Sequence, residues 1–374
     1  MTKIIATRTI IAALLMLAAV TALSPTARAV DIESGQREGF GVAELEDALP
    51  SEAREIVGDM SVMDSVSYDS FFSKIGAAAK SKFSELLKRT LKSSVMLLTV
   101  ALLCSLAGCV YSGDIPDFIP LCGAVAVSAV ALGDVRSFIG MGTESLYRLS
   151  DFSKALLPTI ASAAAASGAV TSASIKYVAS VFFIDLLLAA VVNILMPLVY
   201  AYIAVIIANA ALGGETLEAV CKFLKWICTS ILTILMLAFT GYLSLSGIVS
   251  GAADATMIKI TKSAISSALP VVGGIISGAA DTIVAGAGML RNTIGVFGVI
   301  AVVAICLMPF LTLGLQYLLY KLTAGVAGAL SDKRIGGLIS GMGSAFGIVL
   351  GLIGSGAVMI FISLISSMRA VSGT

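Results

Sequence analysis

The chain has 374 residues, of which 58% are hydrophobic and 13% are charged, and its net charge is +1. Soluble domains have about 45–50% apolar and about 25% charged residues, so this composition indicates a membrane protein with several spans of about 20 residues each. No broad basic surface is present, which argues against nucleic-acid binding. The absence of histidine excludes Ser-His-Asp and Cys-His nucleophilic sites and His-ligated metal centres. We therefore expect no enzyme, no cofactor and no metal site.

Residues 1–29 have the layout of a secretory signal peptide. Lys3 and Arg8 precede an apolar core at Ile10–Leu23, and Ala27–Ala29 supplies an A-x-A cleavage site. A cleaved signal peptide is the favoured interpretation, and an uncleaved first anchor is the alternative. Both interpretations place the following segment outside the cytoplasm.

Residues 30–70 are predicted to form an acidic extracytoplasmic head. They hold eleven Asp and Glu side chains against Arg37 and Arg54. A charge run of this kind is either a solvated surface or a docking face for an extracytoplasmic partner, and the sequence leaves both open.

Residues 71–92 reverse the sign of the charge, with six Lys and Arg side chains against Glu85. Apolar residues recur there at helical spacing, which predicts a basic amphipathic interfacial helix on anionic lipid headgroups. A helix packed against the protein's own body is the alternative. If the signal is cleaved, this basic cluster lies outside the cytoplasm, contrary to the positive-inside rule, so the sidedness of the chain stays open.

Residues 93–374 are predicted to form an all-α, polytopic transmembrane domain. Its seven or eight spans include short or re-entrant segments, and the long run at Tyr177–Leu212 is expected to break near Asn193 and Pro197. The expected spans are Ser93–Tyr111, Phe118–Gly133, Leu156–Thr171, two within Tyr177–Leu212, Ile227–Val249, Ile294–Leu319 and Ser344–Met368.

An interrupted segment is expected at residues 251–292. Its part from Pro270 is rich in glycine and is broken by Asp281 and Arg291, so it is too irregular for an ordinary span. Such backbone lies at membrane depth only where other protein or a water-filled cavity shields it. This segment therefore favours a conduit or a tightly packed assembly.

Five polar residues are candidates for channel lining or packing. Asp185 is the only carboxylate in the run 177–212, and Asn193 follows about two helical turns later. They form either a polar lining or a hydrogen bond between helices. The same two interpretations, cavity lining or structural ion pairs, apply to Asp254, Asp281 and Arg291.

Glycines near the C-terminus have the spacing of helix-packing motifs. Gly337 and Gly341 form one GxxxG pattern, and Gly343, Gly347 and Gly351 form two overlapping ones. This spacing predicts close approach of helices, because small residues allow backbone contact where lipid removes the hydrophobic driving force. Whether the contact lies within one chain or between subunits is left open.

The cysteines are expected to be unpaired thiols, because most lie in or beside apolar runs and none belongs to a CxxC pair. A disulfide from Cys104 or Cys109 to Cys122 is the alternative.

Short motifs of small and polar residues follow one another from about residue 90 to the C-terminus. In chain order they are Leu156-Leu157-Pro158, Ala166-Ser167-Gly168, Thr171-Ser172-Ala173, Pro270-Val271-Val272-Gly273, Ala279-Ala280-Asp281-Thr282, Leu290-Arg291-Asn292, Gly295, Cys306-Leu307-Met308-Pro309 and Tyr320-Lys321-Leu322. With these motifs in this order, the chain resembles the stage III sporulation protein AE family of endospore-forming bacteria. None of the motifs is catalytic.

The resemblance implies a structural subunit in the mother-cell membrane around the forespore, with the acidic head in the space between the two membranes. The implied partners are the other stage III sporulation membrane proteins, a forespore-membrane protein and a cytoplasmic ATPase. Together they are expected to form a secretion-like channel needed for forespore integrity and late forespore-specific transcription. This chain has no GxxxxGK[ST] phosphate-binding loop of its own. The alternative function is a self-contained secondary transporter that uses Asp185 and broken helices in 251–292.

Overall fold

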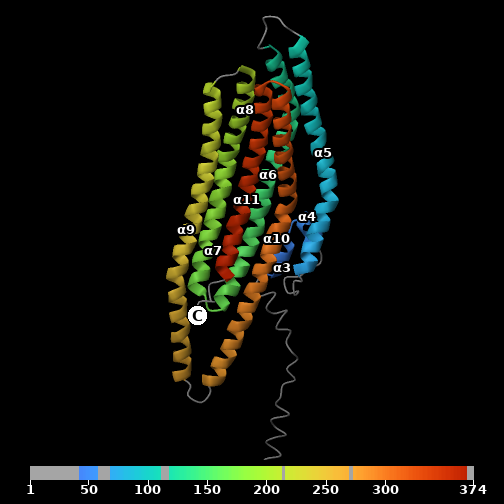
Figure 1. Cartoon of the computed structure of the whole chain (residues 1–374). Helices are drawn as coiled ribbons and strands as arrows, with labels where there is room; N and C mark the ends of the chain where they lie inside the picture. Colours follow the sequence, from blue (N-terminus) through green and yellow to red (C-terminus); the bar gives the residue numbers. More distant parts are fainter. Residues whose placement is uncertain (1–41, 58–67, 111–117, 213–214, 269–272, 369–374) are drawn as a thin grey trace, which may run out of the picture. The chain divides into compact units, whose positions relative to one another are not determined.

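A computed structural model describes residues 42–57, 68–110, 118–212, 215–268 and 273–368 (Figure 1). The chain divides into two units, Met1–Ala43 and Glu44–Thr374, and the description below concerns the second. Every element assigned in the described ranges is helical, which confirms the all-α prediction. The elements are α3 (Val42–Asp47), α4 (Ser51–Val57), α5 (Tyr68–Val110), α6 (Phe118–Ala166), α7 (Val170–Ala190), the π-helical segment η1 (Val191–Leu195), α8 (Met196–Leu212), α9 (Glu215–Ala268), α10 (Gly273–Leu330) and α11 (Lys333–Met368).

Six helices in the described part are long and apolar enough to cross a bilayer. Their bounds are Lys80–Gly108, Phe118–Ala166, Val170–Leu212, Leu217–Ser246, Gly286–Leu330 and Lys333–Met368. The sequence predicted seven or eight spans. The structure has fewer candidate spans because some segments that were expected to be separate spans belong to one continuous helix. The expected short spans Phe118–Gly133 and Leu156–Thr171 belong largely to the single helix α6, which contains Pro158 and ends at Ala166.

Contrary to expectation, the helix does not break near Asn193 and Pro197. It changes there from α-helix to a short π-helical turn. Residues Val191–Leu195 form a π-helical turn, and the Met196 N–H donates to the Val191 carbonyl five residues earlier. A proline removes one backbone donor, and a π turn just before it lets the chain continue as a helix. Val170–Leu212 is therefore one candidate span and not two.

The expected interrupted segment is divided between two long helices. Residues 251–268 end α9, residues 273–292 begin α10, and residues 269–272 lie outside the described part. Residues 71–92 are likewise the first part of the continuous helix α5. The predicted signal peptide and most of the acidic head lie outside the described residues, and α4 falls within that head.

Helix α11 lies at the centre of the bundle, where it contacts α6, α7, α8, α9 and α10 (Figure 1). It forms an antiparallel hairpin with α10, and the Asp332 carboxylate accepts the Arg334 N–H at 2.7 Å at the start of α11. In α10 and α11, 56% of the most apolar window is buried, against 17% in α5 and in α9. The outer helices therefore keep much of their apolar surface for lipid or for other chains.

Three of the five glycines singled out in the sequence lie where α11 comes close to a neighbouring helix. A Cβ atom at Gly343 would lie 3.2 Å from Tyr320, and one at Gly347 would lie 3.1 Å from Tyr317, both on α10. A Cβ atom at Gly341 would lie 2.8 Å from Ile206 of α8. These three contacts are within one chain.

A contact between the α10 and α11 backbones involves two glycines outside the predicted motif. A Cβ atom at Gly336 would lie 2.7 Å from the Cα atom of Gly328, so the α10 and α11 backbones touch there. Gly337 and Gly351 face open space within the chain. The register of the hairpin selects which glycines of α10 and α11 are in contact.

Candidate functional site

The turn between α6 and α7 is a meeting point for polar groups. Helix α6 ends in a Schellman motif, in which the Gly168 N–H donates to Ala165 at 2.9 Å and the Ala169 N–H donates to Ala164 at 3.0 Å. Gly168 has a φ of 91°, a left-handed conformation that favours glycine. This turn fixes where α7 begins.

Asp254 of α9 caps the start of α7 from another helix. Its carboxylate accepts the backbone N–H groups of Thr171 and Ser172, each at 2.9 Å. These N–H groups have no partner inside their own helix, and the helix dipole favours a negative charge at this end. Burial by itself raises the pKa of the Asp254 carboxyl, but the hydrogen bonds from Ser172 and Thr171 outweigh it and lower the pKa.

One buried cation bonds to the turn, and a second lies in the first part of α7. Arg291 of α10 is 5% exposed and donates from Nη1 to the Ser167 hydroxyl at 3.3 Å. Lys176 of α7 is also buried and donates to the Ser366 carbonyl of α11. The α6–α7 turn is therefore tied to α9, α10 and α11. Asp254 and Arg291, both singled out in the sequence, each bond to residues at this turn and not to each other.

A second polar cluster joins α6 to α10 within the bundle. The Asp134 carboxylate accepts from Gln316 Nε2 at 2.9 Å and from the Tyr320 hydroxyl at 2.8 Å. Gln316 and Tyr320 are almost fully buried. One residue later, Lys321 Nζ donates to the hydroxyls of Ser340 and Ser344 at 2.9 and 2.8 Å, which ties α10 to α11.

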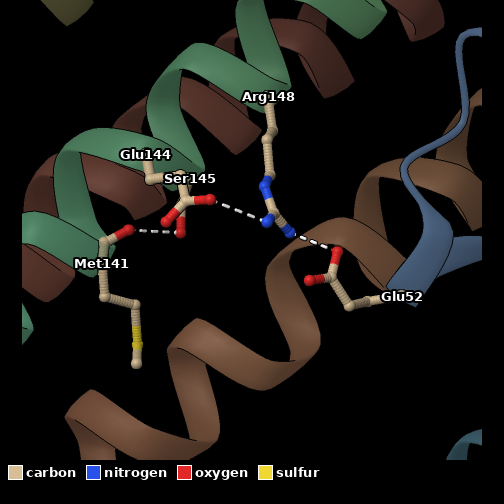
Figure 2. A network of polar contacts seen from close by, with 5 residues as sticks. All are labelled: Glu52, Met141, Glu144, Ser145 and Arg148. Atoms are coloured by element: carbon tan, nitrogen blue, oxygen red, sulfur yellow. Dashed lines mark hydrogen bonds and ion pairs between the residues drawn. The ribbon is translucent and has the colours of Figure 1, made fainter.

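A third cluster joins Arg148 to Glu52 and Glu144 (Figure 2). A cavity lies beside it. The Arg148 guanidinium donates to Glu52 of α4 and, at 2.8 Å, to Glu144 of its own helix. The cavity has a volume of about 280 Å³ and lies between α4, α5, α6 and α10, with Leu86 and Met308 in its wall. This ion pair attaches α4 to the bundle.

An open groove of about 640 Å³ lies beside this cluster, on the exposed side of α6. Arg136, Glu144, Arg148 and Asp151 line it from α6. Its other wall comes from η1 and α8 and includes Tyr200. The groove therefore has a charged wall and a largely apolar wall.

The remaining sequence candidates lie apart from these clusters. Asp185 is exposed on α7 and has no hydrogen bond or ion pair with any described residue. Asn193 is exposed in the π-helical turn, and its Nδ2 donates to the Ala189 carbonyl of its own helix at 2.9 Å. Neither makes a hydrogen bond to another helix within the described part. The Asp281 side chain lies outside the described residues.

Sequence reasoning singled out Asp254 and Arg291 but missed other groups that tie the helices together. Gln316 is a lone amide in the apolar run Ile294–Leu319, and a polar residue in such a run is a signal for a tie between helices. Asp134 directly follows another apolar run and carried the same signal. The sequence around Arg148 gave no such signal, because its partner Glu52 is 96 residues away.

The hydrogen bonds and ion pairs described above join helices to one another. No group of His, Cys, Asp or Glu among them has the arrangement to hold a metal ion. Cys104, Cys122, Cys221, Cys228 and Cys306 are free thiols. Six helices that are long and apolar enough to cross a bilayer, joined by buried polar ties, are compatible with a polytopic helical membrane protein.

Comparison with known proteins places the chain within one family. The family model described as Stage III sporulation protein AE matches residues 52–370, and the chain belongs to this family. Stage III sporulation protein AE of Bacillus subtilis (strain 168) is 24% identical over 197 residues, which are 53% of this chain and 49% of the relative. The chain thus matches about half the length of that curated relative. No solved structure matches significantly.

The motifs that carried the resemblance build two of the polar ties. Ser167, Thr171, Ser172 and Arg291 belong to the cluster at the α6–α7 turn. Tyr320 belongs to the cluster around Asp134. These motifs therefore specify how the helices are joined.

Proposed function

We propose that the chain is a structural membrane subunit of a sporulation-specific, secretion-like channel between the mother cell and the forespore. The observation that carries this function is the family match over residues 52–370. The subunit would lie in the mother-cell membrane around the forespore, with its acidic head in the space between the membranes. It would support forespore integrity and late forespore-specific transcription.

The proposal includes partners. These are the other stage III sporulation membrane proteins, a protein of the forespore membrane and a cytoplasmic ATPase that supplies energy. The sparse burial of α5 and α9 supports a subunit role, because apolar faces of this kind are available to neighbouring chains as well as to lipid.

A self-contained secondary transporter is the weaker alternative. Such transporters place their substrate between broken helices near the middle of the bilayer. The described residues of the segment 251–292 are helical on both sides of residues 269–272, with no break inside α9 or α10, and Asp185 is exposed on α7. These two observations favour the structural role.

Deletion of the gene in a sporulating host tests the proposal. We expect engulfed forespores to collapse and late forespore-specific transcription to fail, and the tagged protein to co-purify with its sibling membrane proteins. Normal spores would contradict the proposed function. Uptake of a small solute by vesicles that contain only this protein would favour the transporter.

A further inference from the structure

The polar cluster between α6 and α10 has two acceptor oxygens without a donor. Gln316 Nε2 and the Tyr320 hydroxyl both donate to Oδ2 of Asp134, at 2.9 and 2.8 Å. No hydrogen bond to the other carboxylate oxygen, Oδ1, is found among the described residues. Gln316 Oε1 is buried and has no hydrogen-bond partner within the described part either. Buried polar atoms almost always have a partner, so the Gln316 oxygen indicates a group that these residues do not supply.

The same cluster carries a negative charge that no described cation balances. Asp134 is half-buried and belongs to none of the ion pairs among the described residues. Its two partners in the cluster, Gln316 and Tyr320, are neutral and are 1% and 0% exposed. A carboxylate that is removed from water in this way is costly unless another group compensates its charge.

The cationic side chains nearest in sequence are directed elsewhere. Lys321 follows Tyr320 on α10, but all three hydrogens of its ammonium group are used in hydrogen bonds to two serines of α11. Arg136 follows Asp134 by two residues on α6, and side chains at that spacing do not face each other on a helix. Arg136 lines the open groove, whose wall comes from α6, η1 and α8. The charge on Asp134 is therefore left for a bound ion.

A cavity reaches the same face of α10. Thr312 lies one helical turn before Gln316, and it lines the cavity of about 280 Å³ that also contains Arg148 in its wall. The other charged residues of this wall are Glu52 and Glu144, so the wall is negative overall. A negatively charged wall raises the local concentration of cations. The cavity thus brings cations to within one helical turn of Gln316.

The two free oxygens match a small monovalent cation. Hard cations bind carboxylate and amide oxygens. One carboxylate and one neutral amide carry a single negative charge, which one positive charge balances. A Ca²⁺ ion takes about six to eight oxygen ligands, often from several carboxylates. No group of three or more His, Cys, Asp or Glu with such an arrangement occurs among the described residues.

We propose that Asp134 and Gln316 bind a small monovalent cation, such as Na⁺, between α6 and α10. The ion takes Asp134 Oδ1 and Gln316 Oε1 as ligands, and water completes its shell. The hydrogen bond from Nε2 to Oδ2 already joins the two groups at 2.9 Å. Their terminal torsions are soft, so small rotations bring both oxygens to one ion. The bound ion ties α6 to α10. This inference goes beyond the proposed function and does not depend on it.

Thermal unfolding of the purified full chain in detergent tests the site, with Na⁺ as the probe. Melting temperatures are measured over a range of NaCl concentrations, and choline chloride keeps the ionic strength constant. We expect the melting temperature to rise by about 2–4 °C for each tenfold increase in Na⁺ above its Kd, because an ion that binds only the folded chain stabilises it. A parallel series in KCl shows which ion the site prefers.

Asp134→Asn should abolish the Na⁺ response, because it removes the charge and still leaves an acceptor for Gln316 and Tyr320. Asp185→Asn is the matched control, since Asp185 is an exposed carboxylate without a described partner, and it should keep the full response. If Asp134→Asn does not fold, binding of radioactive Na⁺ to the wild type and to Gln316→Leu decides. We expect one ion per chain in the wild type and binding at least about tenfold weaker in Gln316→Leu, the smallest loss usual for a group that supports an ion site.

Three results would overturn the inference. Equal melting temperatures in NaCl and in choline chloride would mean that no Na⁺ binds. A Na⁺ response in Asp134→Asn as large as in the wild type would place the ion elsewhere. Stabilisation of the wild type by protons alone, without any response to Na⁺ or K⁺, would assign a proton to Asp134. Equal responses to Na⁺ and K⁺ that both disappear in Asp134→Asn would support an unselective site.

The ion response is independent of the deletion phenotype. A Na⁺ response that requires Asp134, in a chain whose gene is dispensable for sporulation, would leave the ion site and remove the proposed function. Blocked sporulation without any ion response of the chain would do the reverse.

Discussion

The Tyr320 hydroxyl of α10 donates a hydrogen bond to Asp134 of α6 at 2.8 Å, across 186 residues of sequence. The Tyr320 ring also makes an edge-to-face contact with Phe346 of α11, with ring centroids 4.9 Å apart. Phe346 in turn meets Phe138 of α6 at 5.3 Å. One side chain thus joins three helices by a hydrogen bond and by aromatic packing.

Tyr320→Phe should weaken this junction. The variant keeps the ring contact and removes the donor to Asp134, so we expect a loss of about 1 kcal/mol of unfolding free energy, the usual size for a hydrogen bond between membrane helices. Thermal unfolding of the purified chain in detergent measures it. Tyr317→Phe, on the same helix, is the control and should be neutral, because no hydrogen bond of its hydroxyl was found among the described residues. Equal effects of the two variants would show that the Asp134 bond contributes nothing.

Asp254→Asn should destabilise the start of α7 and remove part of the acid sensitivity of the chain. The folded pKa of Asp254 is lowered, so its contribution is fully present above the unfolded pKa of about 3.9 and is lost as the pH falls through the folded pKa. We expect a loss of about 1 kcal/mol near neutral pH, in the range for a helix cap. Melting temperatures of the wild type and the variant should converge as the pH is lowered below about 3.9.

The control for that experiment is Asp185→Asn, which changes an exposed carboxylate without a described partner. Its stability should equal that of the wild type. A constant gap between the wild type and Asp254→Asn at every pH would contradict the capping role of the charge.

Gly336→Ala should force α10 and α11 apart. The new Cβ atom would lie 2.7 Å from the Cα atom of Gly328, and backbone cannot move aside as a side chain does. Overpacking of this kind costs about 1–3 kcal/mol. Gly337→Ala, the adjacent glycine with open space around it, should be neutral or gain up to about 1 kcal/mol from helix propensity. If the two variants melt together, the close contact is absent.

Gly347→Leu and Gly351→Leu separate packing within the chain from packing between chains. Gly347 faces the Tyr317 ring at 3.1 Å, so the larger side chain should lower the melting temperature of the isolated chain. Gly351 faces open space, so Gly351→Leu should leave the isolated chain unchanged. Loss of sibling proteins from the purified complex in Gly351→Leu alone would place that glycine at a subunit interface. An unchanged melting temperature in Gly347→Leu would contradict the packing assigned to it.

Glu52→Gln should loosen α4. The Arg148–Glu52 pair is partly exposed, with side chains 38% and 54% accessible, so the expected loss is only about 0.2–1 kcal/mol. Limited proteolysis is more sensitive than melting here, because α4 has only 7 residues and opens locally. Cleavage around α4 should accelerate in Glu52→Gln and not in Glu55→Gln, an exposed neighbour. Equal cleavage of the two would show that the pair does not attach α4.

Local sequence patterns predicted some features of the fold, and other features depend on contacts between distant residues. The apolar run that ends at Leu212 predicted a membrane helix, but continuity through Asn193 and Pro197 depends on a π-helical turn, which hydropathy does not report. Asp254 and Arg291 were selected as polar residues in an interrupted segment. Their partners at the α6–α7 turn are more than 80 residues away in sequence, so spacing alone does not reveal them.

The sequence by itself determined the class of protein, its helical content and its family resemblance, because hydropathy, glycine spacing and short motifs are properties of each segment taken alone. Only the tertiary structure decided which groups meet. The register of α10 against α11 brings the backbones of Gly328 and Gly336 into contact. The packing of α6 against α10 brings Asp134 within hydrogen-bond distance of the Tyr320 hydroxyl. These relations depend on how far each helix is shifted and rotated against its neighbours, which contacts between distant residues fix.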